Sequence, residues 1–241
     1  GYVGYNVEKP KLSDLKVRQA LDMAINKDAI INAVYQSEGL KATNPMPPTQ
    51  WGYDKSIKDA PYDVEKAKAL MKEAGADKLA INLWYMPVQR PYNPNAKLMA
   101  EMLQADWAKI GVNTKLVTYE WGEYLKRAAK GEPDVILAGW TGDNGDPDNW
   151  LGSLLSCDAV GGNNYSRWCN KDFDTLVTNA RQITNQDDRV SDYVQAQQIF
   201  KEQLPWTTMA HSVVTVFTAP NVIDYKISPL GSIRFDGVKV E

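Results

Sequence analysis

The sequence has 241 residues, of which 27 are Lys or Arg and 30 are Asp or Glu, so its formal net charge is −3. This near-neutral balance supplies no positive field for a phosphate backbone and argues against a nucleic-acid partner. No apolar run approaches the roughly 20 residues that a membrane-spanning helix requires. Eight Trp and 12 Tyr, against one His and two Cys, favour a globular protein that binds a small organic ligand.

The first half of the chain alternates strand-like and helical patterns. Residues 1–8 alternate like a strand with no leader pattern before them, so we expect a mature product or a piece of a longer protein. A Pro-rich stretch at 39–53 predicts a loop, and apolar alternation at 79–85 predicts a strand. Apolar residues at helical spacing predict four helices, at 14–25, 29–35, 63–74 and 94–110. Ser13 and Asn93 are expected to cap the first and the last of these helices.

The second half continues this alternation and then becomes mainly β in character. Residues 112–118 and 134–140 predict strands, and two or three more strands are expected after residue 206. Helical patterns predict three helices, at 121–130, 172–183 and 187–203. Strands that alternate with helices predict an α/β fold with a mixed β-sheet flanked by helices. The β-rich end of the chain is expected to belong to another layer or lobe.

The strongest local feature is the stretch GWTGDNGDPDNW at residues 139–150, directly after an apolar strand. Its three Asp residues suggest a metal, but an EF-hand would need an oxygen ligand where Gly145 stands and a Glu at the twelfth position. A turn followed by a helix cap explains residues 146–149. It does not explain Trp140 and Asp143, which lie where open α/β sheets bind their ligands.

A second feature is the stretch MPVQRPYNPN at residues 86–95, which also follows a predicted strand. Its three Pro residues stiffen the backbone and hold Arg90 at low entropic cost. A rigid Arg suits a planar carboxylate, because its guanidinium donates two parallel hydrogen bonds. The alternative is that Arg90 makes a structural salt bridge.

The remaining chemistry-bearing residues are few. Cys157 and Cys169 have no Cys-x-x-Cys partner and no His cluster, which argues against zinc and leaves a disulfide in an oxidising compartment or two free buried thiols. His211, the only His, lies in a strand-like stretch without a nucleophile elbow and is expected to be structural. Phosphate-binding, dinucleotide and metalloprotease motifs are absent too, so the sequence predicts a binding protein and not an enzyme, with no metal and no cofactor.

Several stretches together carry a family resemblance. They include VRQALDMAINKDAII, YDVEKAKALMKEAG, MPVQRPYNPNAKLMAEMLQADWAKIGV, TYEWGEYLKRAAKGE and GWTGDNGDPDNW. In this order they resemble the periplasmic dipeptide-binding proteins of bacterial ABC importers, within the peptide/opine/nickel class of extracellular solute-binding proteins. The match runs from end to end of the chain, and RPYNPN and GWTGDNGDPDN resemble the dipeptide branch specifically.

The resemblance implies one lobe of a two-lobed periplasmic-binding-protein fold. Members of this family are roughly twice as long and close two lobes around a ligand. By resemblance, residues 1–7 form a hinge strand, residues 8–204 the C-terminal ligand-binding lobe, and residues 205–241 a hinge return and a segment of the other lobe. The N-terminal lobe and the signal peptide are then expected to be absent from this chain.

The resemblance also implies the site. Arg90 is similar to the arginine that pairs with the C-terminal carboxylate of a dipeptide, and Asp143 to the aspartate that pairs with its N-terminal ammonium. Further positions match the family's pocket lining or a disulfide of this branch, namely Gly139, Trp140 and Tyr92 for the lining and Cys157 with Cys169 for the disulfide. A dipeptide is a zwitterion whose end charges lie at most roughly 7 Å apart, so one fixed cation and one fixed anion measure its length.

The function implied is capture of dipeptides or short peptides in the periplasm and delivery to an inner-membrane ABC permease. Relatives of this class also carry glutathione, haem or nickel, so the cargo stays open, and a single His gives nickel little support. A lobe that binds no ligand by itself is a further alternative, because a cleft needs two walls.

Overall fold

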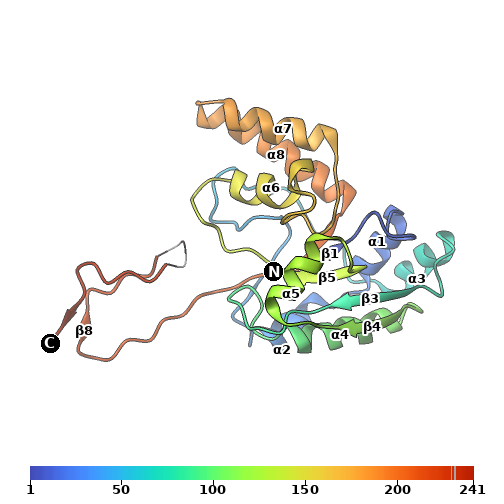
Figure 1. Cartoon of the computed structure of the whole chain (residues 1–241), viewed down its shortest axis with the longest axis horizontal. Coiled ribbons are helices and arrows are strands. Elements are labelled where there is room, and N and C mark those ends of the chain that lie inside the picture. Colours follow the sequence, from blue (N-terminus) through green and yellow to red (C-terminus); the bar gives the residue numbers. More distant parts are fainter. Residues whose placement is uncertain (229, 231) are drawn as a thin grey trace.

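A five-stranded mixed sheet forms the centre of the protein (Figure 1). The computed structural model describes residues 1–228, 230 and 232–241. The strands lie in the order β4-β3-β5-β1-β6, with bounds β1 Tyr2–Tyr5, β3 Ala80–Trp84, β4 Asn113–Val117, β5 Val135–Ala138 and β6 Trp206–Thr208. β3 pairs parallel with β4 and β5, whereas β1 pairs antiparallel with β5 and β6. The predicted α/β fold with a mixed sheet is confirmed.

Helices cover both faces of this sheet. Their bounds are α1 Leu15–Met23, α2 Lys27–Val34, α3 Val64–Glu73, α4 Ala96–Ala108, α5 Trp121–Ala129, α6 Asp148–Leu155, α7 Lys171–Gln182 and α8 Gln186–Gln203. Two-residue strands pair outside the main sheet, β2 Leu40–Lys41 with β7 Ala210–His211 and β8 Val222–Ile223 with β9 Lys239–Val240. A single 3₁₀ turn, Cys157–Ala159, follows α6.

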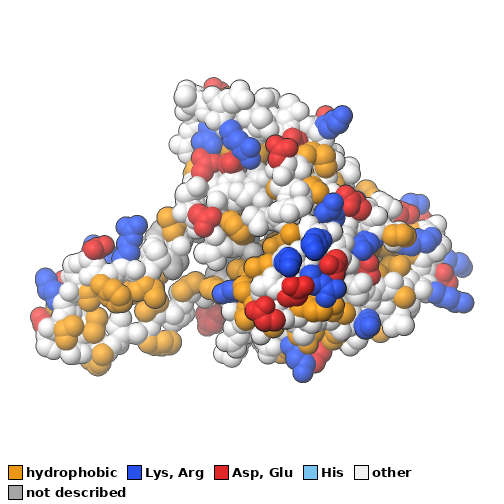
Figure 2. All heavy atoms as spheres, viewed as in Figure 1, with side chains coloured by type: hydrophobic (Ala, Val, Ile, Leu, Met, Phe, Trp, Pro, Cys, Tyr) orange, Lys and Arg blue, Asp and Glu red, His pale blue; other side chains and the backbone are white. Residues whose placement is uncertain are grey.

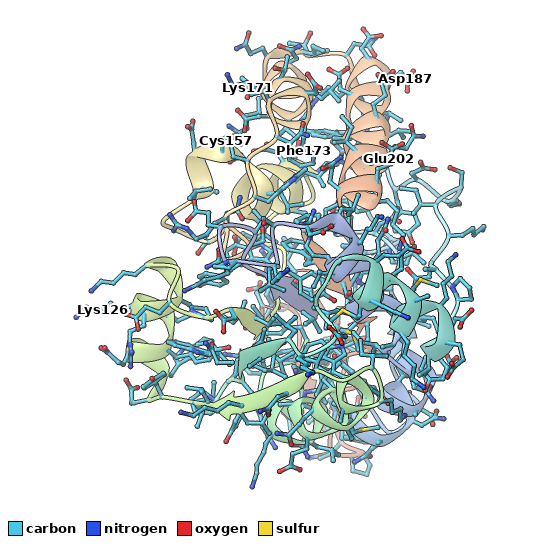
Figure 3. All side chains as sticks on the ribbon, turned by 90° about the vertical axis from the view of Figure 1, so that its right-hand side faces the viewer. Lys126, Cys157, Lys171, Phe173, Asp187 and Glu202 are labelled. Carbon is cyan, nitrogen blue, oxygen red and sulfur yellow. A yellow bond between two sulfur atoms is a disulfide. The ribbon has the colours of Figure 1, made fainter. Side chains whose placement is uncertain are left out.

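The core divides into two clusters, one on each face of β1. Val3 and Tyr5 pack into the larger cluster with apolar side chains of α1 to α4, and Tyr2 packs into the smaller one with α6, α7 and α8. Successive side chains of a strand point to opposite faces, so both faces of β1 are covered and all its residues are buried. Figure 3 shows α7 and α8 side by side above the sheet, with Asp187 at the outer end of α8 and Glu202 near the sheet.

The predicted helices are present with ends shifted by a few residues, and two caps differ from the prediction. Asp14, not Ser13, caps α1, because its carboxylate accepts the backbone N–H of Lys16 at 2.9 Å. Asn95, not Asn93, caps α4. Asn93 instead closes a tight turn with Arg90 through two backbone hydrogen bonds of 2.9 and 3.1 Å. The helix α6 was not predicted, since its sequence read as a turn with a cap.

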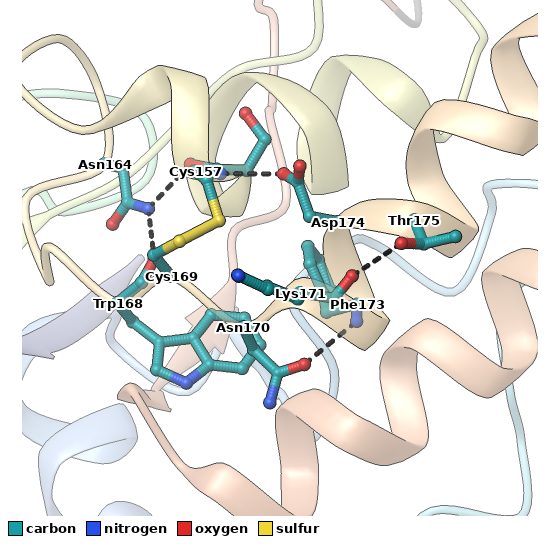
Figure 4. Close-up of a disulfide and its surroundings, with 10 residues drawn as sticks. Cys157, Asn164, Trp168, Cys169, Asn170, Lys171, Phe173, Asp174 and Thr175 are labelled. Carbon is teal, nitrogen blue, oxygen red and sulfur yellow. Dashed lines mark hydrogen bonds between the residues drawn. A yellow bond between two sulfur atoms is a disulfide. The ribbon is translucent and has the colours of Figure 1, made fainter.

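The disulfide between Cys157 and Cys169 is formed, so the alternative of two free thiols is wrong (Figure 4). It closes a loop between α6 and α7. The amide of Asn164 donates within this loop to the carbonyl oxygens of Ser156 at 3.0 Å and Trp168 at 2.8 Å. The loop is therefore cross-linked both covalently and by hydrogen bonds.

The end of the chain differs from its predicted β character. β6 belongs to the central sheet. Residues 212–241 are here called the C-terminal arm; their described part contains the short strands β8 and β9 and extends away from residues 1–211, here called the body (Figure 1). Hydrophobic side chains gather along the arm (Figure 2), with Phe217 91% exposed and Ile233 72% exposed. Apolar residues of this size are rarely left in water without a partner. The division at residues 7 and 204 stays a prediction.

Candidate functional site

A cavity of about 410 Å³ opens at the edge of the sheet where the parallel strands β3 and β5 end. The carboxyl ends of parallel strands meet at one edge, which brings two distant segments together. One is the stretch after β3 and the other is the stretch after β5. All five predicted ligand-binding residues line this cavity, namely Arg90, Tyr92, Gly139, Trp140 and Asp143. Their roles toward a ligand stay predictions.

Arg90 is held in place without an ionic partner. Its backbone is fixed by the turn with Asn93, and its guanidinium carbon lies 4.7 Å from the ring centroid of Trp121. None of the ion pairs between described residues includes Arg90, so the alternative of a structural salt bridge finds no partner there. A guanidinium that lies over an aromatic ring keeps the N–H donors in its own plane free for a ligand.

The ring of Tyr92 packs directly against the backbone of Gly139. A Cβ atom at Gly139 would overlap the ring of Tyr92, so only glycine lets this ring lie against the end of β5. The hydroxyl of Tyr35 donates to the Tyr92 carbonyl oxygen at 2.8 Å and fixes the backbone on the other side. Burial raises the pKa of Tyr92, and the charge of Arg90 partly offsets this effect. Tyr92 is therefore a neutral wall of the cavity.

Asn149 joins the other two site residues. Its Oδ1 accepts the indole N–H of Trp140 and the backbone N–H of Asp143, both at 2.9 Å, while its Nδ2 donates to Oδ2 of Asp143 at 3.1 Å. Asp143 has no ion pair with another described residue. Sequence reasoning treated Asn149 as part of a turn and missed this role. Asn149 is the second residue of α6, and its turn-forming neighbours in the sequence give no sign of its contacts with Trp140 and Asp143.

The three Asp residues of this stretch do not converge on a metal. Asp146 pairs with Arg189 at 2.8 Å, and Asp148 pairs with Arg181 at 2.6 Å. No group of three or more His, Cys, Asp or Glu side chains in the described part of the chain is arranged to hold an ion. The acidic residues other than Asp143 therefore have structural partners.

A second cavity of about 630 Å³ adjoins the first, and both are lined by Tyr92 and Trp140. β6, β7 and the C-terminal arm supply much of its wall, including Trp206 and His211. The Nε1 of Trp206 and the Nε2 of His211 are buried without a hydrogen-bond partner among the described atoms. Burial lowers the pKa of His211 to about 3, so this side chain is neutral at ordinary pH.

A cavity with opposite charges and aromatic walls at the edge of an α/β sheet is that of a ligand-binding domain for a small solute. Residues 1–162 match the family described as bacterial extracellular solute-binding proteins, family 5 Middle. The chain therefore belongs to this family. None of the helices within the described ranges has the length and apolar character needed to cross a bilayer.

The chain is similar to several characterised relatives over its whole length. Di/tripeptide-binding protein 1 of Pseudomonas aeruginosa is 61% identical over 100% of this chain and 45% of that protein. Heme-binding protein A of Haemophilus influenzae is 49% identical over 100% of this chain and 44% of that protein. The solved structure of a dipeptide-binding protein from Pseudoalteromonas sp. SM9913 in complex with Met-Leu is 38% identical, with a TM-score of 0.89 over 100% of this chain and 48% of that chain. The chain thus spans about half the length of these relatives.

Proposed function

We propose that this chain is the ligand-anchoring half of a receptor for dipeptides and other short peptides. The observation that carries the proposal is the pair Arg90 and Asp143, a cation and an anion that line one cavity and have no oppositely charged partner among the described residues. A charged side chain without an ionic partner in a partly enclosed cavity is poised for a charged ligand. The relatives named as dipeptide and di/tripeptide binders support the choice of cargo.

The two opposite charges of the cavity suit a zwitterion. Arg90 would bind the C-terminal carboxylate by two parallel hydrogen bonds, and Asp143 would accept from the N-terminal ammonium. An extended dipeptide spans at most roughly 7 Å between these ends, so two fixed charges select its length. Trp121 and Trp140 would contact ligand side chains through non-directional aromatic surface, which tolerates different sequences. This is binding, with no step that makes or breaks a bond.

We further propose that the whole receptor has two lobes and acts in the periplasm with an inner-membrane ABC permease. The chain's coverage of 45% of the di/tripeptide-binding relative supports a missing N-terminal lobe. The C-terminal arm would dock on that lobe, which would bury Phe217 and Ile233. The disulfide is consistent with an oxidising compartment.

The direct test is the variant Arg90→Ala in the two-lobed protein, expressed with its upstream coding sequence. Loss of the carboxylate's partner is expected to weaken dipeptide affinity roughly a hundredfold by titration calorimetry, since an unpaired charge would be left in the cavity. The matched control is Arg181→Ala, because Arg181 pairs with Asp148 outside the cavity lining. Undiminished affinity in Arg90→Ala, with wild-type behaviour of the control, would refute the proposal.

Haem is the second candidate cargo. The similarity to heme-binding protein A and the two adjoining aromatic cavities favour it, since Tyr92 and Trp140 offer ring surface to both. A spectroscopic titration with haem in the presence of excess dipeptide separates the two. A haem signal that dipeptide suppresses would indicate one shared site, and an unchanged spectrum at all haem concentrations in a titration without dipeptide would remove haem as a cargo. Binding of neither ligand would favour the alternative of a lobe that does not bind by itself.

A further inference from the structure

The segment that carries Asp143 has little structure of its own. Residues 141–147, here called the aspartate loop, connect β5 to α6 without helix or strand, and Asp143, Asn144 and Gly145 are exposed. Fixing the backbone of each such residue costs about 1–2 kcal/mol of conformational entropy. A carboxylate that has to meet a ligand charge at a set distance needs this loop to be ordered before binding. Contacts from elsewhere in the fold must therefore hold it.

Two of these contacts converge on a single backbone atom at the tip of the loop. The carbonyl oxygen of Gly145 accepts the side-chain amide of Gln50 at 2.6 Å and the indole N–H of Trp51 at 2.7 Å. Both donors lie more than 90 residues away along the chain. The loop tip is thus fastened by a segment that does not line the first cavity.

Arg189 of α8 ties the same segment to the next residue of the aspartate loop. Its Nη2 donates to Oδ1 of Asp146 at 2.8 Å, and its guanidinium carbon lies 4.9 Å from the ring centroid of Trp51. Its Nε donates to the Ala180 carbonyl oxygen at 2.8 Å, which orients the guanidinium plane. The planar guanidinium of Arg189 therefore contacts both Trp51 and Asp146 and fixes their positions relative to one another.

The segment around Trp51 is itself anchored to α8. Gln197 is fully buried, and its Oε1 accepts from the side-chain amide of Asn44 at 2.9 Å and the backbone N–H of Asp54 at 3.1 Å. Its Nε2 donates to the Gly52 carbonyl oxygen at 2.7 Å. Gly52 adopts φ +74°, a conformation that favours glycine. These contacts make residues 44–54 a fixed platform and not a mobile flap.

We propose that Gln50, Trp51 and Arg189 are positioning residues for Asp143, and that they set the receptor's preference for a free N-terminal ammonium. This inference rests on the proposed function. The contacts link α8 to the platform and the platform to the carbonyl of Gly145. The backbone of the aspartate loop connects Gly145 to Asp143 two residues earlier. Arg90, at the other end of the ligand, is not touched by any of these contacts, so losing them acts on one end of the peptide only.

The experiment uses the double variant Gln50→Ala/Trp51→Phe in the two-lobed protein. Phenylalanine keeps a ring against Arg189 and Tyr193 but cannot donate to Gly145, and alanine removes the other donor. Loss of two neutral hydrogen bonds to the loop is expected to raise the Kd of a free dipeptide about tenfold. The Kd of the N-acetylated dipeptide is expected to change by less than about twofold, since it lacks the ammonium. The readout is the Kd of the N-acetylated peptide divided by the Kd of the free dipeptide.

Each outcome of this experiment decides something. A ratio that falls about tenfold supports the positioning role. A ratio equal to that of the unmutated protein, or a parallel loss of affinity for both peptides, overturns it, because a merely structural role weakens both ligands alike. If the unmutated protein already binds both peptides equally, the role of Asp143 in the proposed function fails instead.

A second pair of variants guards against misfolding. Arg189→Lys keeps the charge but loses the planar contacts with Asp146, Tyr193 and Trp51, whereas Arg181→Lys makes the same change at an exposed pair outside the aspartate loop. Hydrogen exchange of the Asp143 amide, which donates to Asn149, is expected to speed up about tenfold in Arg189→Lys and to stay unchanged in Arg181→Lys. Equal exchange in both variants contradicts the proposal.

Discussion

At the scale of single residues, the site depends on close approaches that leave no room for change. Gly139 is the clearest case, since the ring of Tyr92 occupies the space of its missing side chain. Asn149 is the second, since it bonds Trp140 and both the backbone and the carboxylate of Asp143. Two uncharged residues therefore shape the wall of the cavity and hold the carboxylate of Asp143.

Gly139→Ala is expected to displace the ring of Tyr92, because the added Cβ atom would overlap it. Overpacking of this kind typically costs about 1–3 kcal/mol. Chemical denaturation of the 241-residue chain should show this loss in the free energy of unfolding. Gly145→Ala is the matched control, because a Cβ there would meet no atom within 4 Å. In the double variant Gly139→Ala/Tyr92→Ala the loss should be smaller than the sum of the two single losses, and a purely additive double variant would contradict the account.

His211 is expected to make stability depend on pH. Its pKa is about 3 in the folded chain against 6.5 unfolded, so between these values the unfolded state binds more protons at this site. The free energy of unfolding should then fall as pH falls below about 6.5. Thermal unfolding at neutral and mildly acidic pH should show a smaller acid-induced loss in His211→Gln than in the wild type. Identical pH dependence in the two proteins would contradict the burial of this imidazole.

At the scale of elements, the loop between α6 and α7 reaches the site. The disulfide closes this loop, and its residues Asn163 and Tyr165 line the first cavity. Asp174 of α7 also accepts the backbone N–H of Cys157 at 2.8 Å, which fixes the start of the loop on the helix (Figure 4). Order in this loop is thus coupled to the shape of the cavity wall.

Reduction of the disulfide is expected to lower stability by about 3 kcal/mol in the chain-entropy model for a short loop. Thermal unfolding with and without a thiol reductant measures it directly, since the two Cys of this bond are the only ones in the sequence. The variant Cys157→Ser/Cys169→Ser should unfold at the lower temperature and show no response to the reductant. A wild-type transition that does not move on verified reduction would contradict the prediction.

Most elements could be predicted from the sequence, because an element with one buried face has apolar residues at regular spacing. Two helix caps and the helix α6 were not predicted, for physical reasons. Asp14 and Asn95 could not be separated from Ser13 and Asn93 as caps, since each of these polar side chains lies within three residues of the helix start. The helix α6 could not be predicted because its first two residues, Asp148 and Asn149, belong to a stretch at 146–149 that is typical of a turn with a helix cap.

The residues that line the cavity could be predicted from the sequence, but the contacts that hold the aspartate loop could not. Arg90 and Asp143 each follow a strand, and the rule for parallel strands places them at one edge. The contacts of Gln50, Trp51 and Arg189 with the aspartate loop join segments far apart in sequence, and no local pattern encodes such a contact. Long-range side-chain bonds to backbone carbonyls are visible only in the folded chain.

At the scale of the whole molecule, the body and the arm differ in burial. The body buries large aromatic side chains such as Trp107 and Trp206, whereas the arm exposes Phe217 and Phe235. An arm with few buried contacts contributes little to the stability of the body. The proposed function assigns this apolar surface to contact with an N-terminal lobe.

Removal of the arm is therefore expected to leave the body folded. A chain ending at residue 211 should unfold within a few degrees of the full 241-residue chain, because the core clusters include none of the described arm residues. It should also bind less of a dye that reports exposed apolar surface. Loss of cooperative unfolding in the shortened chain would contradict the assignment of the arm to a partner surface.

The central claim is that two fixed charges, Arg90 and Asp143, measure the two ends of a peptide. It is tested most directly by titrating the two-lobed protein with one dipeptide in three forms, namely free, N-acetylated and C-terminally amidated. Each blocked form is expected to bind roughly a hundredfold more weakly than the free peptide, since each leaves one of the two charges unpaired. Equal dissociation constants for the three forms would contradict the account.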